Sequence, residues 1–545
     1  MKFDSFYIMI FLLISLLITI KTELTKRNLQ SIYNNEFQEG IYLIKDIEGH
    51  LNLKLINDTL FFSSQEDRDT LDKFRIYQKE SEKIPEYETY NIDEKIYYYI
   101  EEKKTKKKLY FDDSTDSVFA SDTIKQGDDD KFLWEIKIAR IRNNLNYFEI
   151  KTKNKNKFIA YDSKNELSKA YCESSWTSLA VDRSSKIKLI KLYRENKNKN
   201  KKSDLLDKEP IDVVIKYIDL NDTSLVRNDF DQINKDKQNN ELKYSLRSIL
   251  QNIPWVRKIF IVMPNDNIPY LKEKEEIKEK IIYIKDSTVL GFDSSSPPAF
   301  QFNIHTLKKH GLSENFILMD DDYFIAQPLS KSDLFYEENN KIYPYLISNQ
   351  YYEIEESELK LQYMSYLSNI NEINYHSKEG FSFRKISTLL FLNKVFGNKK
   401  NIFDPLIEVG FTHNAIPLKI SDVEEVFDNI EKLYQHSEVC LRGKKRNIRT
   451  LQPQILFMSY VRNKYDRPVN EISYKYYDLS DIRKVNLESK LFVINVEDKE
   501  YYPLRYQTEQ EVLNGLFPNP MKYEKEYKNK DENTNINTKA KKMKN

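Results

Sequence analysis

The first part of the chain alternates short apolar runs with polar turns. Over residues 36–193 three similar stretches follow one another, in which "KLINDTLFFSS" leads to "KFRIYQ", "KKLYFDDSTDSVFASD" to "KFLWEIKI" and "KFIAYDSKNELSKAYCES" to "SKIKLIKLY". Short runs in which apolar and polar residues alternate between turn residues are typical of β-strands. The pattern therefore predicts an all-β domain over residues 36–193.

The threefold repeat in this domain resembles that of β-trefoil proteins of the lectin and fascin kind, in which closure of the barrel removes exposed strand edges. An irregular β-sandwich accounts for the same short strands, so both topologies stay open. Residues 194–210 then read "RENKNKNKKSDLLDKEP", a segment that is charged, nearly free of apolar side chains and ends in proline. This composition predicts a linker.

From residue 211 onward the period of the apolar positions changes. The β-branched run "IDVVIKYID" suits a buried strand, and "ELKYSLRSILQN" places four apolar residues on one helical face. Further strands are predicted in "KIFIVMP", "KIIYIKD" and "NFILMD", and "AFQFNIHTLKKHG" predicts a helix that ends at Gly311. Strands that alternate with helices predict an α/β domain over residues 211–515 with a mostly parallel, doubly wound sheet, in which ligands bind outside the carboxyl ends of the strands.

Two terminal segments lie outside these domains. Residues 1–22, "MKFDSFYIMIFLLISLLITIKT", contain an apolar run that is shorter than the roughly 20 residues of a full membrane span, which favours a signal peptide. No clear small-residue cleavage site follows, so an uncleaved N-terminal membrane anchor is the second interpretation. Either one predicts entry into the secretory pathway, with the ER or Golgi lumen or secretion as the destination. Residues 521–545 are too polar to bury anything, which predicts a disordered tail.

The overall charge and the cysteine count exclude several classes of function. Lysine and arginine number 86 against 85 aspartates and glutamates, for a net charge of +1, so no global positive field favours nucleic acid as a partner. Only Cys172 and Cys440 are present, which excludes a disulfide framework and a four-cysteine zinc site. Because the net charge is close to zero, any site for a phosphate group must be formed by a local group of positive side chains.

The strongest chemical signal is "FILMDDDYF", residues 316–324. A predicted strand leads into Asp320, Asp321 and Asp322, which places carboxylates at the edge of the sheet where ligands bind. Carboxylates this close repel one another unless they share a positive partner, and a hard divalent cation suits them. Since Mg²⁺ prefers one or two carboxylates together with phosphate oxygens, a substrate linked to a nucleotide diphosphate fits. A solvated acidic turn is the alternative interpretation.

Three further residues have side chains suited to catalysis or to phosphate binding. His413, in "FTHNAIPLKI", has the side chain whose pKa best suits proton transfer near neutral pH. Arg442 lies in "CLRGKKRNIR", a segment rich in arginine, whose guanidinium matches phosphate oxygens. Arg247 lies off the apolar stripe of its predicted helix and faces either a ligand or solvent. An ordinary loop histidine and a basic surface loop are the alternatives for the first two.

Several of these segments together, and in this order, resemble conserved blocks of the Stealth proteins. "IDVVIKYIDLND" is similar to the first block, "NNELKYSLRSILQNIPWVRKIFIVMPNDNIPYL" through "GLSENFILMDDDYFIAQPLSKSDLF" to the second, and "FTHNAIPLKISDVEEVF" with "CLRGKK" to the third. That family includes the lysosomal-enzyme N-acetylglucosamine-1-phosphotransferase and bacterial capsule polymerases. The resemblance covers roughly Ile211 to Tyr460 and does not extend to the β-rich region.

The resemblance implies a Rossmann-like nucleotide-sugar fold and a defined reaction. A sugar 1-phosphate would pass from a nucleotide sugar, such as UDP-N-acetylglucosamine, to a hydroxyl of a glycan or glycoprotein acceptor, and a nucleoside monophosphate would be released. Matched residue by residue, Asp321 and Asp322 would hold Mg²⁺ or Mn²⁺, and Asp322 would also take part in catalysis. His413 would be the base, and Arg442 would face the phosphate.

The remaining matched positions imply contacts with the substrate and also show where the chain departs from the family. Asp219 and Arg247 fall within the first and second blocks, and the family's glutamate in the helix before the acidic strand is replaced by Gln301, or by Asn303 in another register. Asp320 falls where relatives often have asparagine. Two other functions stay open: a glycosyltransferase that uses an Asp-x-Asp site and releases a nucleoside diphosphate, and a glycan-binding protein with a decayed catalytic half.

Overall fold

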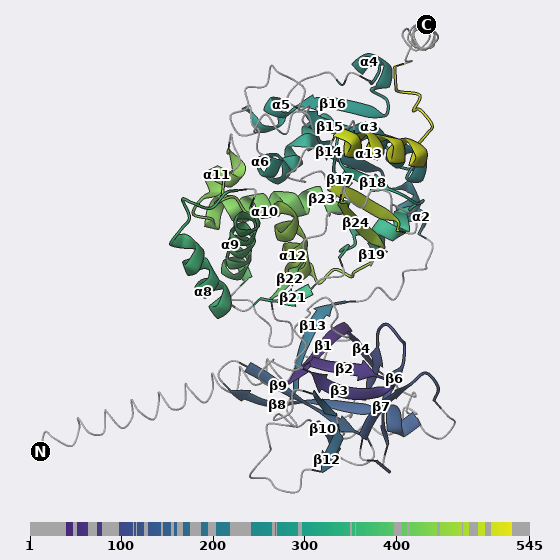
Figure 1. Cartoon of the computed structure of the whole chain (residues 1–545), viewed down its shortest axis with the longest axis vertical. Helices are drawn as coiled ribbons and strands as arrows, with labels where there is room; N and C mark the ends of the chain where they lie inside the picture. The colour runs from purple at the N-terminus through teal and green to yellow at the C-terminus, as the bar shows by residue number, and fades with distance from the viewer. Residues whose placement is uncertain are drawn as a thin grey trace, which may run out of the picture. The chain divides into compact units, whose positions relative to one another are not determined.

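A computed structural model divides the chain into two compact units, residues 1–191 and residues 192–545 (Figure 1). The predicted signal segment, residues 1–22, lies outside the described residues. The structure describes the following ranges: 40–46, 52–63, 73–78, 98–112, 114–115, 117–124, 129–142, 145–153, 157–160, 167–169, 171–174, 187–194, 203–217, 241–263, 268, 270–292, 297–348, 351–354, 356–375, 377–396, 406–410, 415–443, 447–470, 472–478, 489–495 and 503–525.

The first unit is an all-β domain, as the alternation of apolar residues predicts. Its described strands form one 13-stranded sheet in which the neighbouring strands pair antiparallel. Trp134 lies in the core of the unit, where its indole nitrogen donates to the Leu109 carbonyl oxygen at 3.1 Å. The strands are β1 (Gly40–Asp46), β2 (Asn52–Ile56), β3 (Thr59–Ser63), β4 (Phe74–Gln78), β5 (Tyr98–Glu102), β6 (Lys108–Asp112), β7 (Ser117–Ser121), β8 (Trp134–Arg142), β9 (Leu145–Thr152), β10 (Lys157–Ala160), β11 (Leu167–Lys169), β12 (Tyr171–Ser174) and β13 (Ile187–Tyr193).

A two-residue turn sets the register of one hairpin in this sheet. Asn57 and Asp58 join β2 to β3 and both have positive φ, 49° and 62°. A hairpin loop of two residues with positive φ twists in the same sense as its strands, and asparagine and aspartate tolerate that conformation. The turn pairs Ile56 with Thr59 and sends Leu60 into the core.

The second unit is built around a five-stranded sheet with the order β16-β15-β14-β17-β23. Its four parallel strands are β14 (Ile211–Lys216), β15 (Ile259–Met263), β16 (Ile281–Lys285) and β17 (Asn315–Asp320), and β23 (Ile416–Lys419) joins β17 antiparallel. The chain runs outward from β14 through β15 to β16 and then returns to place β17 on the other side of β14. Between β14 and β17 the strand order therefore reverses, and ligands bind at such a point in open α/β sheets.

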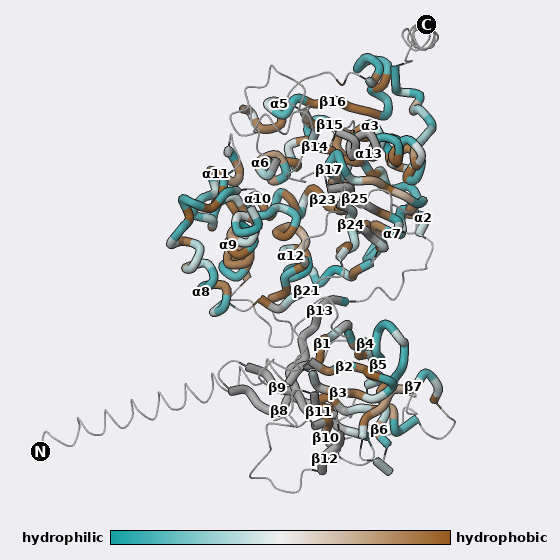
Figure 2. Tube along the Cα trace, viewed as in Figure 1, coloured by the Kyte–Doolittle hydropathy of each residue, from teal (hydrophilic) through white to brown (hydrophobic). Residues whose placement is uncertain are grey.

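Helices and smaller sheets surround this central sheet, so the α/β class predicted for the second unit is confirmed (Figure 1). In Figure 2, apolar residues mark β16 and recur along α9 and α12. The described helices of eight or more residues are α3 (Glu241–Asn252), α8 (Glu356–Leu367), α9 (Lys378–Phe396), α10 (Ile420–Leu433), α12 (Pro453–Tyr465) and α13 (Pro503–Leu516). The shorter ones are α2 (Asp204–Lys208), α4 (Lys274–Ile277), α5 (Asp286–Leu290), α6 (Pro297–Phe302), η5 (Ile304–His310), α7 (Lys331–Leu334) and α11 (Ser437–Leu441). The smaller sheets are formed by β18 (Tyr323–Ile325), β24 (Tyr474–Asp478) and β25 (Leu491–Asn495), by β19 (Phe335–Glu338) and β20 (Lys341–Pro344), and by β21 (Tyr351–Glu353) and β22 (Ile407–Val409).

No helix among the residues described by the structure combines the length and the apolar character that a membrane crossing requires.

The helix predicted in "AFQFNIHTLKKHG" is present as two pieces. The α-helix α6 ends at Phe302, and the 3-10 helix η5 continues to Gly311, whose φ of +86° closes the segment as predicted. Asn303 stands at the break, where its side-chain amide donates to the carbonyl oxygens of Ala299 and Leu441 at 2.8 and 2.9 Å. The break in the helix involves a bond to Leu441, which is distant in the sequence. The spacing of apolar residues within the helix therefore could not reveal it.

Part of the predicted linker is ordered against the second unit, which corrects the prediction for residues 203–210. Ser203 caps α2 by accepting a hydrogen bond from the Leu206 amide at 2.9 Å, and Leu206 is buried. Lys331 donates to the carbonyl oxygens of Leu206, Asp207 and Glu209 at the end of this helix. The buried Leu206, the Ser203 cap and the bonds from Lys331 hold a segment whose composition is otherwise that of a linker.

The beginning of the predicted disordered tail is also ordered. Met521 is buried in the core of the second unit, and Glu524 forms a β-bridge with Leu271. The Glu524 carboxylate also pairs with the buried Arg247. The prediction for residues 521–525 is therefore wrong, because their composition did not reveal the buried arginine that they cover.

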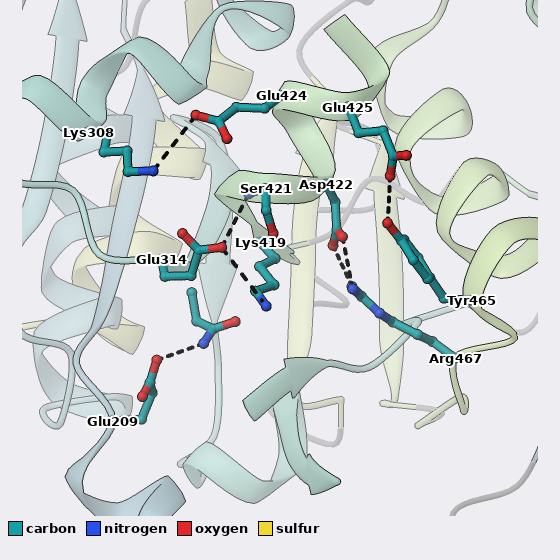
Figure 3. Close-up of polar contacts among 11 residues, drawn as sticks. Glu209, Lys308, Glu314, Lys419, Ser421, Asp422, Glu424, Glu425, Tyr465 and Arg467 are labelled. Carbon is teal, nitrogen blue, oxygen red and sulfur yellow. Dashed lines mark hydrogen bonds and ion pairs between the residues drawn. The ribbon is translucent and has the colours of Figure 1, made fainter. Parts of the chain in front are cut away.

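Polar contacts hold the amino ends of the central strands, away from their carboxyl ends (Figure 3). Asn315, the first residue of β17, donates to the Glu209 carboxylate at 2.7 Å. In the first turn of α10, Asp422 forms a two-pronged ion pair with Arg467 at 2.5 and 2.9 Å, and both side chains are buried. The Tyr465 hydroxyl donates to the carboxylate of Glu425, which also lies in α10, at 2.5 Å. These bonds attach α10 to the last residue of α12 and to the segment that follows it.

Candidate active site

The three aspartates follow a fully apolar stretch of strand, as the sequence predicts. Phe316 to Met319 are almost completely buried in β17, which ends at Asp320, and β18 begins at Tyr323 directly after the turn. Asp320 stands in register with Lys216 on the neighbouring β14. The aspartates therefore lie at the carboxyl end of the sheet, beside the point where its strand order reverses.

The surroundings of Asp321 and Asp322 disfavour negative charge on either of them. Burial, together with the neighbouring Asp320, raises the pKa of Asp321 to about 7. Burial and the two preceding aspartates raise the pKa of Asp322 well above its ordinary value. Both residues are nevertheless partly exposed, so a ligand can reach them. A bound cation would reverse the balance, because an opposite charge favours the ionised carboxylate.

The carboxylates offer a cation a small set of ligands. Within the described part of the chain, no group of three or more His, Cys, Asp or Glu side chains is arranged to hold a metal ion. Asp321 and Asp322 alone match a site that Mg²⁺ or Mn²⁺ would complete with water and phosphate oxygens, since Mg²⁺ binds through one or two carboxylates together with a phosphorylated substrate. The residues present are compatible with such an ion.

A buried ion pair lies at the same edge of the sheet and was not found from the sequence. The Lys216 ammonium, at the end of β14, donates to the Asp286 carboxylate at 2.9 Å, and both side chains are almost completely buried. The ammonium also lies 5.7 Å from the centre of the Phe300 ring of α6. The pair attaches the start of α5, and the ring beside it, to the strand next to the aspartates. A lysine at the end of a strand that is apolar except for Asp212 was the signal available in the sequence.

The structure places Gln301 and Asn303 in this neighbourhood. Gln301 follows Phe300 in α6 and is 6 % exposed, and Asn303 directly follows the last residue of α6. The bond from the Asn303 amide to the Leu441 carbonyl brings the end of α11 against α6. Leu441 directly precedes Arg442, so Asn303 contacts the backbone one residue before Arg442.

Arg442 is held by two glutamates at the surface. Its guanidinium donates to Glu438 of α11 at 2.7 Å and to Glu431 of α10 at 2.9 Å, and about half of the side chain is exposed. The hydrogen bond with Glu431 and the charge of Glu438 raise the pKa of Arg442. Exposed pairs of this kind are weak and exchange easily for another anion. The phosphate-facing role predicted for Arg442 stays a prediction.

Arg247 is occupied by the protein itself. Its guanidinium makes two bonds of 2.7 Å to the Glu524 carboxylate and donates to the Phe517 carbonyl oxygen at 2.8 Å. The side chain is buried on α3 and binds protein groups, so it does not face solvent. The geometry gives it the role of fastening the C-terminal segment. Its predicted contact with a substrate has no support in these bonds and stays untested.

Asp219 and His413 lie outside the described residues, so their predicted roles stay predictions.

A family model decides what the aspartate region belongs to. Residues 235–343 match Stealth protein CR2, conserved region 2. The chain carries a Stealth region. The match begins just before α3 and ends within β20, so it contains the aspartates, the Lys216 partner Asp286, and Gln301. The resemblance to the Stealth family is thereby confirmed.

Similar proteins with assigned activities are phosphotransferases. The chain is 27% identical over 286 residues to the capsular polysaccharide phosphotransferase fcs1 of Haemophilus influenzae, which covers 49% of this chain and 69% of that protein. It is 30% identical over 189 residues to the N-acetylglucosamine-1-phosphotransferase subunits alpha/beta of Mus musculus, 31% of this chain and 15% of that protein. It is 31% identical over 199 residues to the capsular polysaccharide phosphotransferase cps1A of Actinobacillus pleuropneumoniae, 36% of this chain and 46% of that protein. The chain thus matches less than half the length of the last two. These relatives support a transferase that acts in sugar-phosphate transfer.

The similar solved structures cover less than a third of this chain. The designed three-fold symmetric protein ThreeFoil has a TM-score of 0.21 at 13% identity and covers 28% of this chain and 99% of its own. SeviL bound to asialo-GM1 saccharide has a TM-score of 0.21 at 16% identity and covers 29% and 100%. Scores of this size do not decide the topology of the domain.

Proposed function

We propose that this Stealth protein transfers a sugar 1-phosphate from a nucleotide sugar to a hydroxyl of a glycan or glycoprotein acceptor and releases a nucleoside monophosphate. The observation that carries the proposal is the pair Asp321–Asp322 at the reversal of the strand order, within the Stealth region. The strand order and direction around it agree with a Rossmann-like nucleotide-sugar domain. UDP-N-acetylglucosamine is the donor to examine first, because one of the relatives is named for N-acetylglucosamine-1-phosphate transfer.

The chemistry requires positioning and neutralisation of charge more than covalent help from the protein. Mg²⁺ or Mn²⁺ on Asp321 and Asp322 would neutralise the charge that develops on the phosphate oxygens. Arg442 would exchange its two glutamates for the transferred phosphate, and Gln301 and Asn303 would line the donor side of the site. His413 would take the proton from the attacking hydroxyl, and Asp219 would contact the donor.

The all-β unit has a separate place in the proposal. A β-trefoil would present the acceptor glycan, and the N-terminal segment would direct the protein to the secretory pathway as a lumenal, single-anchor or secreted enzyme. A second candidate function is a glycosyltransferase that releases a nucleoside diphosphate. The Asp-x-Asp spacing of Asp320 and Asp322 favours it.

Donor hydrolysis by the full chain tests the proposal. Nucleotide sugars are screened with Mg²⁺ and with Mn²⁺, and we expect cation-dependent turnover of at least one donor. Asp322→Asn should reduce it by on the order of 100-fold, because a group that stabilises charge in the transition state is lost. Asp428→Asn, an exposed residue on α10, is the matched control and should keep full turnover. Unchanged turnover in Asp322→Asn would refute the assignment of the site.

A further inference from the structure

Helix α3 runs alongside β18, the strand that follows the aspartates. The Ser245 hydroxyl donates to the Tyr323 carbonyl oxygen at 2.8 Å, and the Ile325 amide donates to the Ser248 hydroxyl at 3.1 Å. The Asn252 amide then donates to the Ile325 carbonyl oxygen at 2.6 Å. The bonds advance in the same direction along both elements, so the helix and the strand run parallel.

This alignment places the first residue of α3 beside the aspartates. Glu241 precedes Ser245 by four residues and lies on the same helical face, one turn of about 5.4 Å earlier. Tyr323, which Ser245 contacts, directly follows Asp322, and Asp321 and Asp322 form the turn that precedes β18. The first turn of α3, which contains Glu241, therefore lies close to the two aspartates. It is 8 % exposed, which is unusual for a glutamate.

One electrostatic effect agrees with this placement. The charges of Asp321 and Glu241 both contribute to the raised pKa of Tyr270, for which burial is the main cause. The Tyr270 hydroxyl is buried and has no hydrogen-bond partner among the described residues. A buried donor without an acceptor beside a group of carboxylates indicates that a bound ligand or its water completes the site.

We infer that Glu241 is a positioning residue for the divalent cation of the proposed transfer. It acts through a bound water, which the Tyr270 hydroxyl also contacts, and not as a direct third ligand, because the described side chains form no three-membered metal cage. Its negative charge strengthens the attraction of the Asp321–Asp322 pair for the cation, as groups outside the direct ligands commonly do. The inference rests on the proposed function for the presence of a cation, but not for the identity of the donor.

Binding of Mn²⁺ to the full chain, measured by calorimetry without any nucleotide sugar, tests this role. Glu241→Gln keeps the size of the side chain and removes its charge, and we expect the Kd for Mn²⁺ to rise about 10-fold. Glu358→Gln, in the first turn of another 12-residue helix, should leave the Kd unchanged. Asp322→Asn should abolish binding, which locates the ion. An unchanged Kd in Glu241→Gln would overturn the inference.

A second measurement separates positioning of the cation from support of the fold. The melting temperature of each variant is recorded without metal and with Mn²⁺, and Glu241→Gln should lose stabilisation by the ion. A glutamate with a structural role only would lower the metal-free melting temperature and leave the Mn²⁺ increment intact. If Glu241→Gln fails to fold, Glu241→Asp, which withdraws the carboxylate by one methylene, should show the same weaker binding, and a wild-type Kd in it would overturn the inference. Mn²⁺ binding without turnover of any donor would count against the proposed function alone.

Discussion

Burial and the neighbouring aspartates disfavour negative charge on Asp321 and Asp322. An apolar strand that leads into adjacent carboxylates is visible in the sequence, so this part of the site could be predicted. The Lys216–Asp286 pair could not, because its two residues are 70 positions apart in the sequence and only the fold brings them together. Charges that meet through tertiary packing leave no local pattern in a sequence.

The raised pKa of Asp321 predicts how Mg²⁺ stabilisation depends on pH. A folded pKa of about 7, above the ordinary 3.8, means that the folded chain binds this proton more tightly than the unfolded chain. That contribution to stability is complete below about pH 4 and is lost as pH rises through about 7. Mg²⁺ requires the ionised carboxylate, so we expect it to raise the melting temperature little at pH 5 and more at pH 8.

Melting curves at the two pH values, with and without Mg²⁺, check this expectation. Asp321→Asn serves as the comparison and should show a small Mg²⁺ effect at both. Equal stabilisation of the wild-type chain at pH 5 and pH 8 would contradict the assignment of the cation to these carboxylates.

Helix α3 has two buried faces, one that carries its apolar stripe and one that carries Arg247. Its sequence pattern does not distinguish them. The apolar period showed that Arg247 lies off the buried stripe of the helix, and this suggested a ligand or solvent. The structure shows instead that Glu524 and the Phe517 carbonyl oxygen cover it. Periodicity identifies the face of a helix that packs against its nearest sheet, but a second face covered by a distant segment appears polar. The same reason explains why residues 521–525 were predicted to be disordered.

The Arg247–Glu524 pair is expected to contribute strongly to the stability of the second unit. Both side chains are buried, at 5 % and 9 % exposure, so Glu524→Ala leaves the guanidinium without its carboxylate. Loss of one partner of a buried ion pair costs about 3–5 kcal/mol in free energy of unfolding. Urea denaturation should show a loss of this size, and Glu276→Ala, an exposed residue in α4, should show almost none. A loss below about 1 kcal/mol in Glu524→Ala would mean that the C-terminal segment is not fastened in this way.

For the whole molecule, the division into an all-β region and an α/β region was predictable because the period of the apolar residues changes near residue 211. The order of the central strands was not, because pairing between β14 and β17 joins segments that are distant in the sequence. The antiparallel strand β23 likewise reaches the sheet only after several helices. Whether the first unit is a β-trefoil remains a prediction from its threefold repeat.

The nucleotide released during turnover is the most direct test of the account. The full chain is supplied with a nucleotide sugar that it turns over, the divalent cation and a glycan acceptor, and the products are separated by chromatography. Transfer of a sugar 1-phosphate predicts release of the nucleoside monophosphate and a phosphodiester in the acceptor, with neither formed by Asp322→Asn. Release of the nucleoside diphosphate without any monophosphate would contradict the account and identify a glycosyltransferase.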